Sequence, residues 1–168
     1  MPVKEHRKAA EQISVNFCLI VTSDAVLRGE RKDLITPLVK DLVASAGTLK
    51  HSEVVPNDLK KIQDSVRTFA RRCDVVLVTG GTGIGDRDVS VDAVRDLCVK
   101  EIPGFGELFR HLTYVRHGTA ALMSRAFACR VGYAAVFVTP GSPDAVNLAL
   151  KELIIPESKH LVYELRRR

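Results

Sequence analysis

The sequence lacks the segments that place a protein in or across a membrane. No apolar run approaches the roughly 18 residues that a membrane helix needs. The stretch from Met1 to Gln12 carries six ionisable side chains and no apolar core of a secretory signal. Hydrophobic residues make up 46% of the 168 residues and charged residues 27%, which is typical of a soluble globular protein. We therefore expect a cytoplasmic protein without a membrane partner.

The sequence also lacks paired cysteines. Cys18, Cys73, Cys98 and Cys129 are widely spaced, and none belongs to a Cys-x-x-Cys pair. Cys18 stands in an apolar run that resembles a buried strand, where a thiol behaves as a small hydrophobic group. We therefore expect neither a zinc site nor a disulfide framework.

Positive charge exceeds negative charge, with a net charge of +5 and an isoelectric point near 9.2. Such a balance suits anionic partners, either nucleic acids or phosphorylated small molecules. Part of the excess lies at the two ends, in Lys4, Arg7, Lys8 and residues 166–168, which we expect to be solvated. No recognition helix or RNA-binding aromatic motif is present, so we do not expect nucleic acid as the partner.

Apolar patterns alternate between strand and helix along the chain. Continuous apolar runs predict strands at 16–21, 53–55, 75–78 and 134–138. Helical spacing predicts helices at 38–43, 59–70, 91–98, 105–115, 120–129, 145–153 and 160–165. This order is typical of an α/β fold with three layers, a Rossmann-like, mostly parallel sheet with helices on both faces. We predict a basic N-terminal extension over residues 1–14 and a single domain over residues 15–168.

A glycine-rich loop after the third predicted strand is the sharpest functional signal. Gly80, Gly81, Gly83 and Gly85 fall within six residues, and glycine lets backbone N–H groups approach an anion closely. We expect the following helix to begin with Ser90 as its N-cap and to add its positive end to a phosphate site. The alternative is an ordinary tight turn. The spacing fits neither a P-loop, which counted from Gly80 requires a lysine where Asp86 stands, nor a dinucleotide-binding motif, which counted from Gly81 requires a glycine there.

Two further groups of polar residues extend this predicted site. In an open parallel sheet, ligands bind beyond the carboxyl ends of the strands, where we also expect loops 22–24, 56–58 and 140–144. Asp88 is the candidate ligand for Mg²⁺, which prefers carboxylates and substrate phosphates; the alternative is a surface charge cluster. Ser142 followed by Pro143 is a strong helix start, with or without a binding role.

Five motifs in order resemble the MoaB/Mog family of molybdopterin adenylyltransferase domains. They are Thr22-Ser23-Asp24, the segment from Thr79 to Gly83 with Arg87-Asp88-Val89, the segment from Glu101 to Glu107, Ser124-Arg125, and the turn from Pro140 to Pro143. The resemblance spans residues 16 to about 156 and implies the molybdopterin-binding fold.

The resemblance implies Mg²⁺-dependent transfer of an adenylyl group from ATP to the phosphate of molybdopterin, with release of pyrophosphate. It assigns nucleotide and phosphate binding to Gly80, Gly81, Thr82, Gly83, Ser23 and Asp24. It assigns molybdopterin binding to Ser124, Arg125, Gly141, Ser142 and Pro143. It further implies a separate metal-insertion protein as the downstream partner and a homotrimer or a hexamer made of two trimers.

One catalytic position departs from the family pattern. The family has two aspartates linked to catalysis; Asp88 matches the first, but Asn57 aligns with the second. An amide can orient a ligand but brings no charge to a metal ion. Either Asp58 takes over, or the metal site is weaker, or the protein is a non-catalytic molybdopterin carrier.

Overall fold

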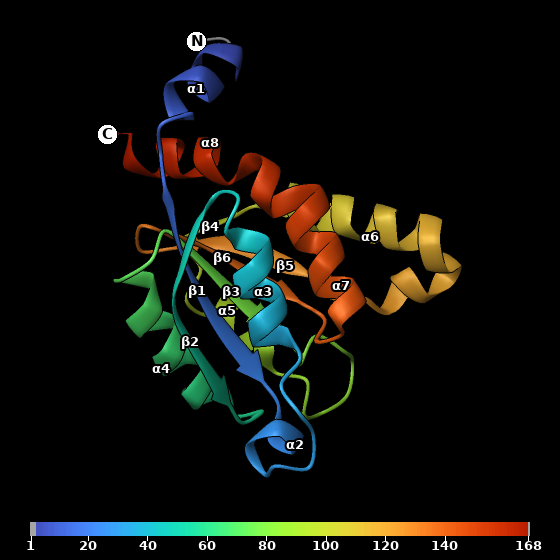
Figure 1. Ribbon diagram of the computed structural model, residues 1–168. Helices are drawn as coiled ribbons and strands as arrows, with labels where there is room; N and C mark the ends of the chain where they lie inside the picture. Colours follow the sequence, from blue (N-terminus) through green and yellow to red (C-terminus); the bar gives the residue numbers. More distant parts are fainter. Residues whose placement is uncertain (1–2, 168) are drawn as a thin grey trace.

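The computed structural model describes residues 3–167, which form a mixed sheet covered by helices on both faces (Figure 1). Within these residues the sheet has six strands in the order β2-β1-β3-β6-β5-β4. Strands β1 (Val15–Thr22), β2 (Gly47–Val55), β3 (Val75–Thr79) and β6 (Ala134–Thr139) are parallel. Strands β5 (Phe127–Val131) and β4 (Lys100–Glu101) are antiparallel to their neighbours. The predicted α/β class with a mostly parallel sheet is confirmed.

The helices divide between the two faces of the sheet (Figure 1). One face carries α3 (Ile35–Val43), α6 (Pro103–His117), α7 (Pro143–Leu148) and α8 (Ile155–Arg166), and the other carries α4 (Leu59–Ala70) and α5 (Ser90–Arg95). A π-helical segment, Ala149–Ile154, joins α7 to α8, and a 3-10 segment, Gly118–Met123, follows α6. Helix α2 (Asp24–Leu27) follows the carboxyl end of β1, whereas α1 (Val3–Ala10) lies near α8 at the opposite end.

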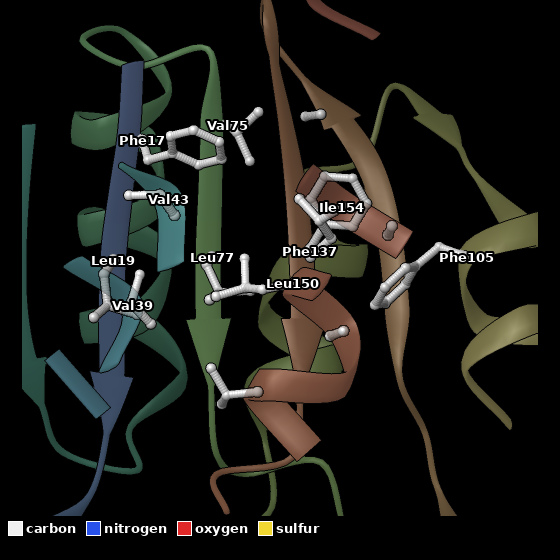
Figure 2. Packing of buried hydrophobic residues seen from close by; sticks show 14 of the residues in the cluster. Phe17, Leu19, Val39, Val43, Val75, Leu77, Phe105, Phe137, Leu150 and Ile154 are labelled. Atoms are coloured by element: carbon white, nitrogen blue, oxygen red, sulfur yellow. The ribbon is translucent and has the colours of Figure 1, made fainter. Parts of the chain in front are cut away.

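Strands β1 and β3 supply side chains to both hydrophobic layers. In β1, Phe17 and Leu19 point into the layer shown in Figure 2, while Cys18 and Ile20 point into the other. This division follows from the two-residue period of a strand. Since both faces are covered, the strands read as continuous apolar runs, which is why sequence patterns located β1 and β3 well.

The predicted helix at 120–129 is wrong. Residues 118–123 form the 3-10 segment, and residues 127–131 form β5. Strand β5 pairs with β6 through a tight turn at Gly132 and Tyr133, with Gly132 at φ +58°. Glycine favours such a hairpin turn, and pairing with β6 overrides the helical tendency of the alanine-rich sequence.

The predicted absence of disulfides is also wrong, because Cys18 and Cys73 form a disulfide. Their Cα atoms lie 5.9 Å apart. Cys73 lies in the turn between α4 and β3, which runs beside β1, where the N–H of Asp74 donates to the carbonyl of Asn16 at 2.9 Å. The 55-residue separation of the two cysteines gives no local sequence signal for this pairing. Among the described residues, Cys98 and Cys129 keep free thiols.

The basic residues near the two termini are exposed but form ion pairs within the chain. Arg7 on α1 pairs with Glu157, and Arg166 on α8 donates to Asp74 at 2.9 Å. Both arginine side chains remain more than half exposed, so each pair contributes little to stability. Met1, Pro2 and Arg168 of the predicted termini lie outside the described residues. Over the part of the chain that is described, no helix combines the length and apolar character needed to cross a membrane.

Candidate functional site

The four loops expected at one edge of the sheet do meet there. They follow β2, β1, β3 and β6, which are consecutive neighbours in the sheet. Hydrogen bonds tie the loops together: Ser23 N–H donates to the carbonyl of Val55 at 3.0 Å, and Gly80 N–H to that of Thr139 at 2.9 Å. The carboxyl ends of parallel strands thus form a shared rim, as predicted for a ligand site.

Glycine is required at two positions of the loop after β3. Gly80 and Gly81 have φ angles of +91° and +67°, a region that other residues adopt only with strain. A Cβ at Gly80 would lie 2.6 Å from the carbonyl oxygen of Thr22, and one at Gly81 would lie 2.5 Å from Oγ of Ser90. The backbone therefore runs closer to β1 and α5 than any side chain would allow.

Ser90 holds this loop from within α5 rather than capping the helix. The predicted N-cap is wrong by one residue, since Val89 occupies the cap and Ser90 is the first helical residue. Ser90 is fully buried, donates its N–H to the carbonyl of Gly81 at 3.1 Å, and places Oγ 3.3 Å from Oγ1 of Thr22. The hydroxyl of Thr22 also donates to the carbonyl of Thr79 at 2.7 Å. These contacts fix the path of the loop.

Several hydrogen-bonding groups of the loop and rim make no bond within residues 3–167. They are the N–H groups of Gly81, Thr82 and Gly83, and the hydroxyls of Thr79 and Thr139, which are completely buried. Buried polar groups in native proteins nearly always have a partner. Consecutive backbone N–H groups of this kind bind anions.

Two cavities flank the glycine-rich loop and meet at Ser142. The first, the glycine-loop cavity, has a volume of about 510 Å³ and brings together Ser23, Gly80, Gly81, Gly141, Ser142 and Pro143. The second, the α6 cavity, has a volume of about 550 Å³ and includes Thr82, Gly83, Ser124 and again Ser142. Both volumes suit a small-molecule ligand. Ser142 caps α7 through a 3.2 Å bond from the N–H of Ala145 and precedes Pro143, as predicted.

Sequence reasoning missed four cationic or ionisable residues of these cavities. Arg31 and Lys32 line the glycine-loop cavity, and Arg116 and His117 line the α6 cavity. The basic pair at 31–32, in a polar loop shortly after a buried strand, was an available signal. No local pattern pointed to the end of α6, because its approach to the glycine loop depends on tertiary packing.

Asp24 lies at the centre of a polar cluster beside the glycine-rich loop. Its carboxylate accepts the N–H and the side-chain amide of Asn57, both at 3.1 Å, and the guanidinium of Arg87 at 2.6 Å. The hydrogen bonds from Asn57, followed by the charge of Arg87, hold the pKa of Asp24 below its ordinary value. Asn57 in turn directs Oδ1 toward Gly81, where it would lie 3.2 Å from an added Cβ.

The acidic candidates Asp88 and Asp58, and the nearby Asp92, have separate positions. Asp88 accepts the N–H of Gly85 at 3.0 Å through Oδ2. The same oxygen would lie 2.6 Å from a Cβ added at Gly83. Asp58 is the N-cap of α4 and accepts the N–H of Lys61 at 2.9 Å. Asp92, at the start of α5, pairs with Arg125 at 2.6 Å. Asp58 is thus engaged in helix capping, whereas Asp88 belongs to the loop itself.

Arg125 is not brought to the glycine-loop cavity. It lines a third hollow of about 460 Å³ together with Arg95 and Arg110, and Ser124 lies on the border between this hollow and the α6 cavity. Of the residues assigned to molybdopterin, Gly141, Ser142 and Pro143 therefore gather at one cavity, Ser124 reaches the neighbouring one, and Arg125 faces a different surface.

Comparisons with known proteins agree with this architecture. Residues 18–160 match a family described as a probable molybdopterin binding domain. The chain is 43% identical to molybdenum cofactor biosynthesis protein B of Bacillus subtilis, with 99% of each chain covered. A crystal structure of a molybdenum cofactor biosynthesis protein B superposes with a TM-score of 0.86 at 37% identity, covering 93% of this chain and 98% of that one. The tungsten cofactor synthesizing protein MoaB from Pyrococcus furiosus gives 0.85 at 33% identity, covering 92% and 98%.

Proposed function

Because this chain belongs to the MoaB/Mog family and takes part in molybdenum or tungsten cofactor biosynthesis, we propose that it adenylylates molybdopterin. In this reaction an oxygen of the molybdopterin phosphate forms a bond to the α-phosphorus of ATP. The bond from that phosphorus to the bridging oxygen breaks, and pyrophosphate leaves with its electron pair. The products are adenylylated molybdopterin and pyrophosphate.

The observation that carries the proposal is the set of unpaired N–H groups at Gly81, Thr82 and Gly83 between two cavities. Two anionic substrates must meet with their phosphates in contact, and the loop is the shared wall of the two cavities. Arg31 and Lys32 add positive charge at one side. Preorganised donors and cations of this kind are the main catalytic devices in phosphoryl transfer.

The nucleophile requires alignment rather than a base. A phosphate monoester is largely ionised near neutral pH, since its second pKa is about 6. The absence of a histidine from the polar cluster of Asp24, Asn57 and Arg87 is therefore compatible with the reaction. What the chain supplies is the position of the two phosphates, through backbone donors whose path is fixed by Thr22 and Ser90.

The residues present fit a Mg²⁺ ion that arrives with the nucleotide. Asp88 offers Oδ1, which makes no hydrogen bond within the described chain, and Mg²⁺ is commonly held by one or two carboxylates plus substrate phosphates. Asp24 is less suited, because three donors already occupy its carboxylate. We assign the ion to Asp88. When bound, Mg²⁺ would neutralise phosphate charge.

A non-catalytic molybdopterin carrier is the second candidate, and Asn57 is the observation that favours it. Its side-chain amide donates to Asp24, so the second acidic position of the family carries no charge here. A carrier would bind the pterin tightly without consuming ATP.

Pyrophosphate release from ATP, Mg²⁺ and molybdopterin together distinguishes the two candidates. We expect release only when all three are present, and a loss of about 100-fold or more in Asp88→Asn, the usual effect of removing a group that stabilises transition-state charge. Asp86→Asn is the matched control, because Asp86 is an exposed carboxylate of the same loop and we expect it to retain activity. Tight molybdopterin binding without adenylylated product would establish the carrier instead.

We also propose that the protein works as a homotrimer or as two paired trimers, and that a metal-insertion protein receives its product. Exposed apolar side chains at Leu108, Tyr114 and Val115 lie on α6 and could face a neighbouring subunit. In contrast, Phe105 and Phe109 are buried in the core of the same chain. Light scattering of the purified protein measures the subunit number directly.

A further inference from the structure

A cluster of two histidines and a glutamate lies between α1 and α8, at the end of the molecule opposite the glycine-rich loop (Figure 1). One ligand atom from each of His6, His160 and Glu164 lies within 4.8 Å of the others. The adenylyl-transfer proposal makes no use of this cluster. We propose that it binds a divalent transition-metal ion, with Zn²⁺ as the best chemical match.

The spacing of the three side chains is the first argument. His160 and Glu164 are four residues apart on α8, so they share one helix face, and Nε2 of His160 lies 3.8 Å from Oε1 of Glu164. Nδ1 of His6 lies 2.5 Å from the same oxygen. Ligand bonds to Zn²⁺ are about 2.0–2.2 Å long for nitrogen and oxygen, so shifts of about 1 Å would place all three groups around one ion.

The orientation of His160 is the second argument. Its Nδ1 lies 3.1 Å from a carboxylate oxygen of Glu157, and a carboxylate only accepts, so Nδ1 carries the proton. The lone pair is then on Nε2, the atom nearest Glu164. A histidine oriented by a carboxylate through its other nitrogen is the usual arrangement in metal sites.

The charges around the cluster leave its centre open to a cation. Arg7 pairs with Oε1 of Glu157 and Arg167 with Oε2 of Glu164, at 3.2 Å in the latter case. Each carboxylate therefore uses one oxygen for an arginine and directs the other toward an imidazole. The two arginines lie on the outer oxygens, and the three ligand atoms face one another.

Burial and ligand type decide which metal fits. His6 is only 8% exposed and packs against the ring of Tyr163, with ring centroids 5.5 Å apart, so the cluster is partly shielded from water. Two imidazoles and one carboxylate match the three-ligand sites of Zn²⁺, which keep a fourth position for water. Mg²⁺ prefers oxygen ligands and is not expected here. The ion would join α1 to α8.

Titration of tag-free, chelator-treated protein with Zn²⁺, followed by calorimetry, tests the site. We expect one saturable equivalent per chain, and at least a 10-fold weaker Kd in His160→Ala and in Glu164→Gln, the range seen when even outer partners of a metal site are removed. Glu157→Gln should weaken binding less. His111→Ala is the control, because His111 is an exposed histidine on α6 and should leave Kd unchanged.

Co²⁺ provides a second readout that does not depend on variants. Binding at this cluster should give the visible spectrum of a nitrogen and oxygen site, and should raise the protection of α1 amides in hydrogen exchange. The proposal is overturned by the absence of saturable binding, by an unchanged Kd in His160→Ala, or by thiolate charge-transfer bands, which would assign the ion to Cys98 or Cys129.

Discussion

Gly81→Ala should disrupt the glycine-rich loop for two separable reasons. The first is backbone strain, because alanine at φ +67° costs about 1–2 kcal/mol. The second is overlap of the new Cβ with Oγ of Ser90 at 2.5 Å, and relieving such a contact in a packed site costs about 1–3 kcal/mol. We expect the free energy of unfolding to fall by about 2–5 kcal/mol in total, with ATP binding lost.

A matched control and a rescue variant separate the two contributions. Gly132 has a similar φ of +58° but nothing within 4 Å of an added Cβ, so Gly132→Ala reports the strain alone, about 1–2 kcal/mol. Ser90→Ala removes the clashing oxygen at a cost of about 1 kcal/mol for its contact with Thr22. Added to Gly81→Ala, it should restore part of the loss, because Cβ of residue 90 would still lie 3.3 Å away.

Urea denaturation of all four variants at one protein concentration measures these differences, and calorimetry with ATP measures binding. Equal destabilisation by Gly81→Ala and Gly132→Ala would show that the contact with Ser90 is unimportant. Wild-type ATP affinity in Gly81→Ala would refute the assignment of the glycine-rich loop to phosphate.

Three further predictions concern the disulfide and the polar cluster. Reduction of the Cys18–Cys73 disulfide, which closes a 55-residue loop, should lower the free energy of unfolding by up to about 4 kcal/mol. Urea midpoints with and without reductant measure this loss. In a variant with both cysteines replaced by alanine, the midpoint should not change with reductant. Because the pKa of Asp24 is lowered by Asn57 and Arg87, its stabilising contribution is complete above its ordinary value of 3.8 and is lost as pH falls through the lower, folded-state value. Asp24→Asn should flatten that part of the stability profile in urea titrations between pH 2 and 5. Asn57→Asp should tighten Mg²⁺ binding by about 10-fold, because a second carboxylate then faces Asp24 and a cation relieves their repulsion; unchanged Mg²⁺ affinity by calorimetry would contradict this reasoning.

Sequence patterns predicted the strands and helices whose burial follows a simple local pattern. They missed the features that depend on contacts with segments distant in the sequence. Strands β1 and β3 are covered on both faces and helix α4 has one apolar stripe, so local patterns were sufficient. Strand β5 depends on pairing with β6 across Gly132, and the Cys18–Cys73 disulfide depends on the turn before β3 lying beside β1. Neither condition leaves a periodic signal in the residues themselves.

The candidate site divides in the same way. The position of the glycine-rich loop was predictable, because four glycines directly follow a buried strand. Its neighbours were predictable as well, because loops that follow parallel strands share one edge of the sheet. The cavity under α6 was not, because its residues reach the loop through the packing of separate segments. The basic pair Arg31 and Lys32 offered a sequence signal, but its place in the glycine-loop cavity depends on the fold. The spacing of residues also gave no hint that Asp24 would be the acid surrounded by donors.

The contacts of Asn57 suggest that it stabilises the polar cluster with Asp24 rather than weakening a metal site. An aspartate at this position would set an oxygen about 3 Å from Oδ2 of Asp24, where the amide nitrogen of Asn57 now lies at 3.1 Å, and two carboxylates at that distance need a bound cation or a shared proton. Asparagine removes this need, because it donates to Asp24 and keeps the cluster intact without metal. Metal binding should therefore be separable from folding of the loop in this chain, and in the proposed reaction Asp88 is the acidic group that would hold an ion carried by the nucleotide. If Asp88→Asn left Mg²⁺-dependent turnover unchanged, this division of roles would be wrong.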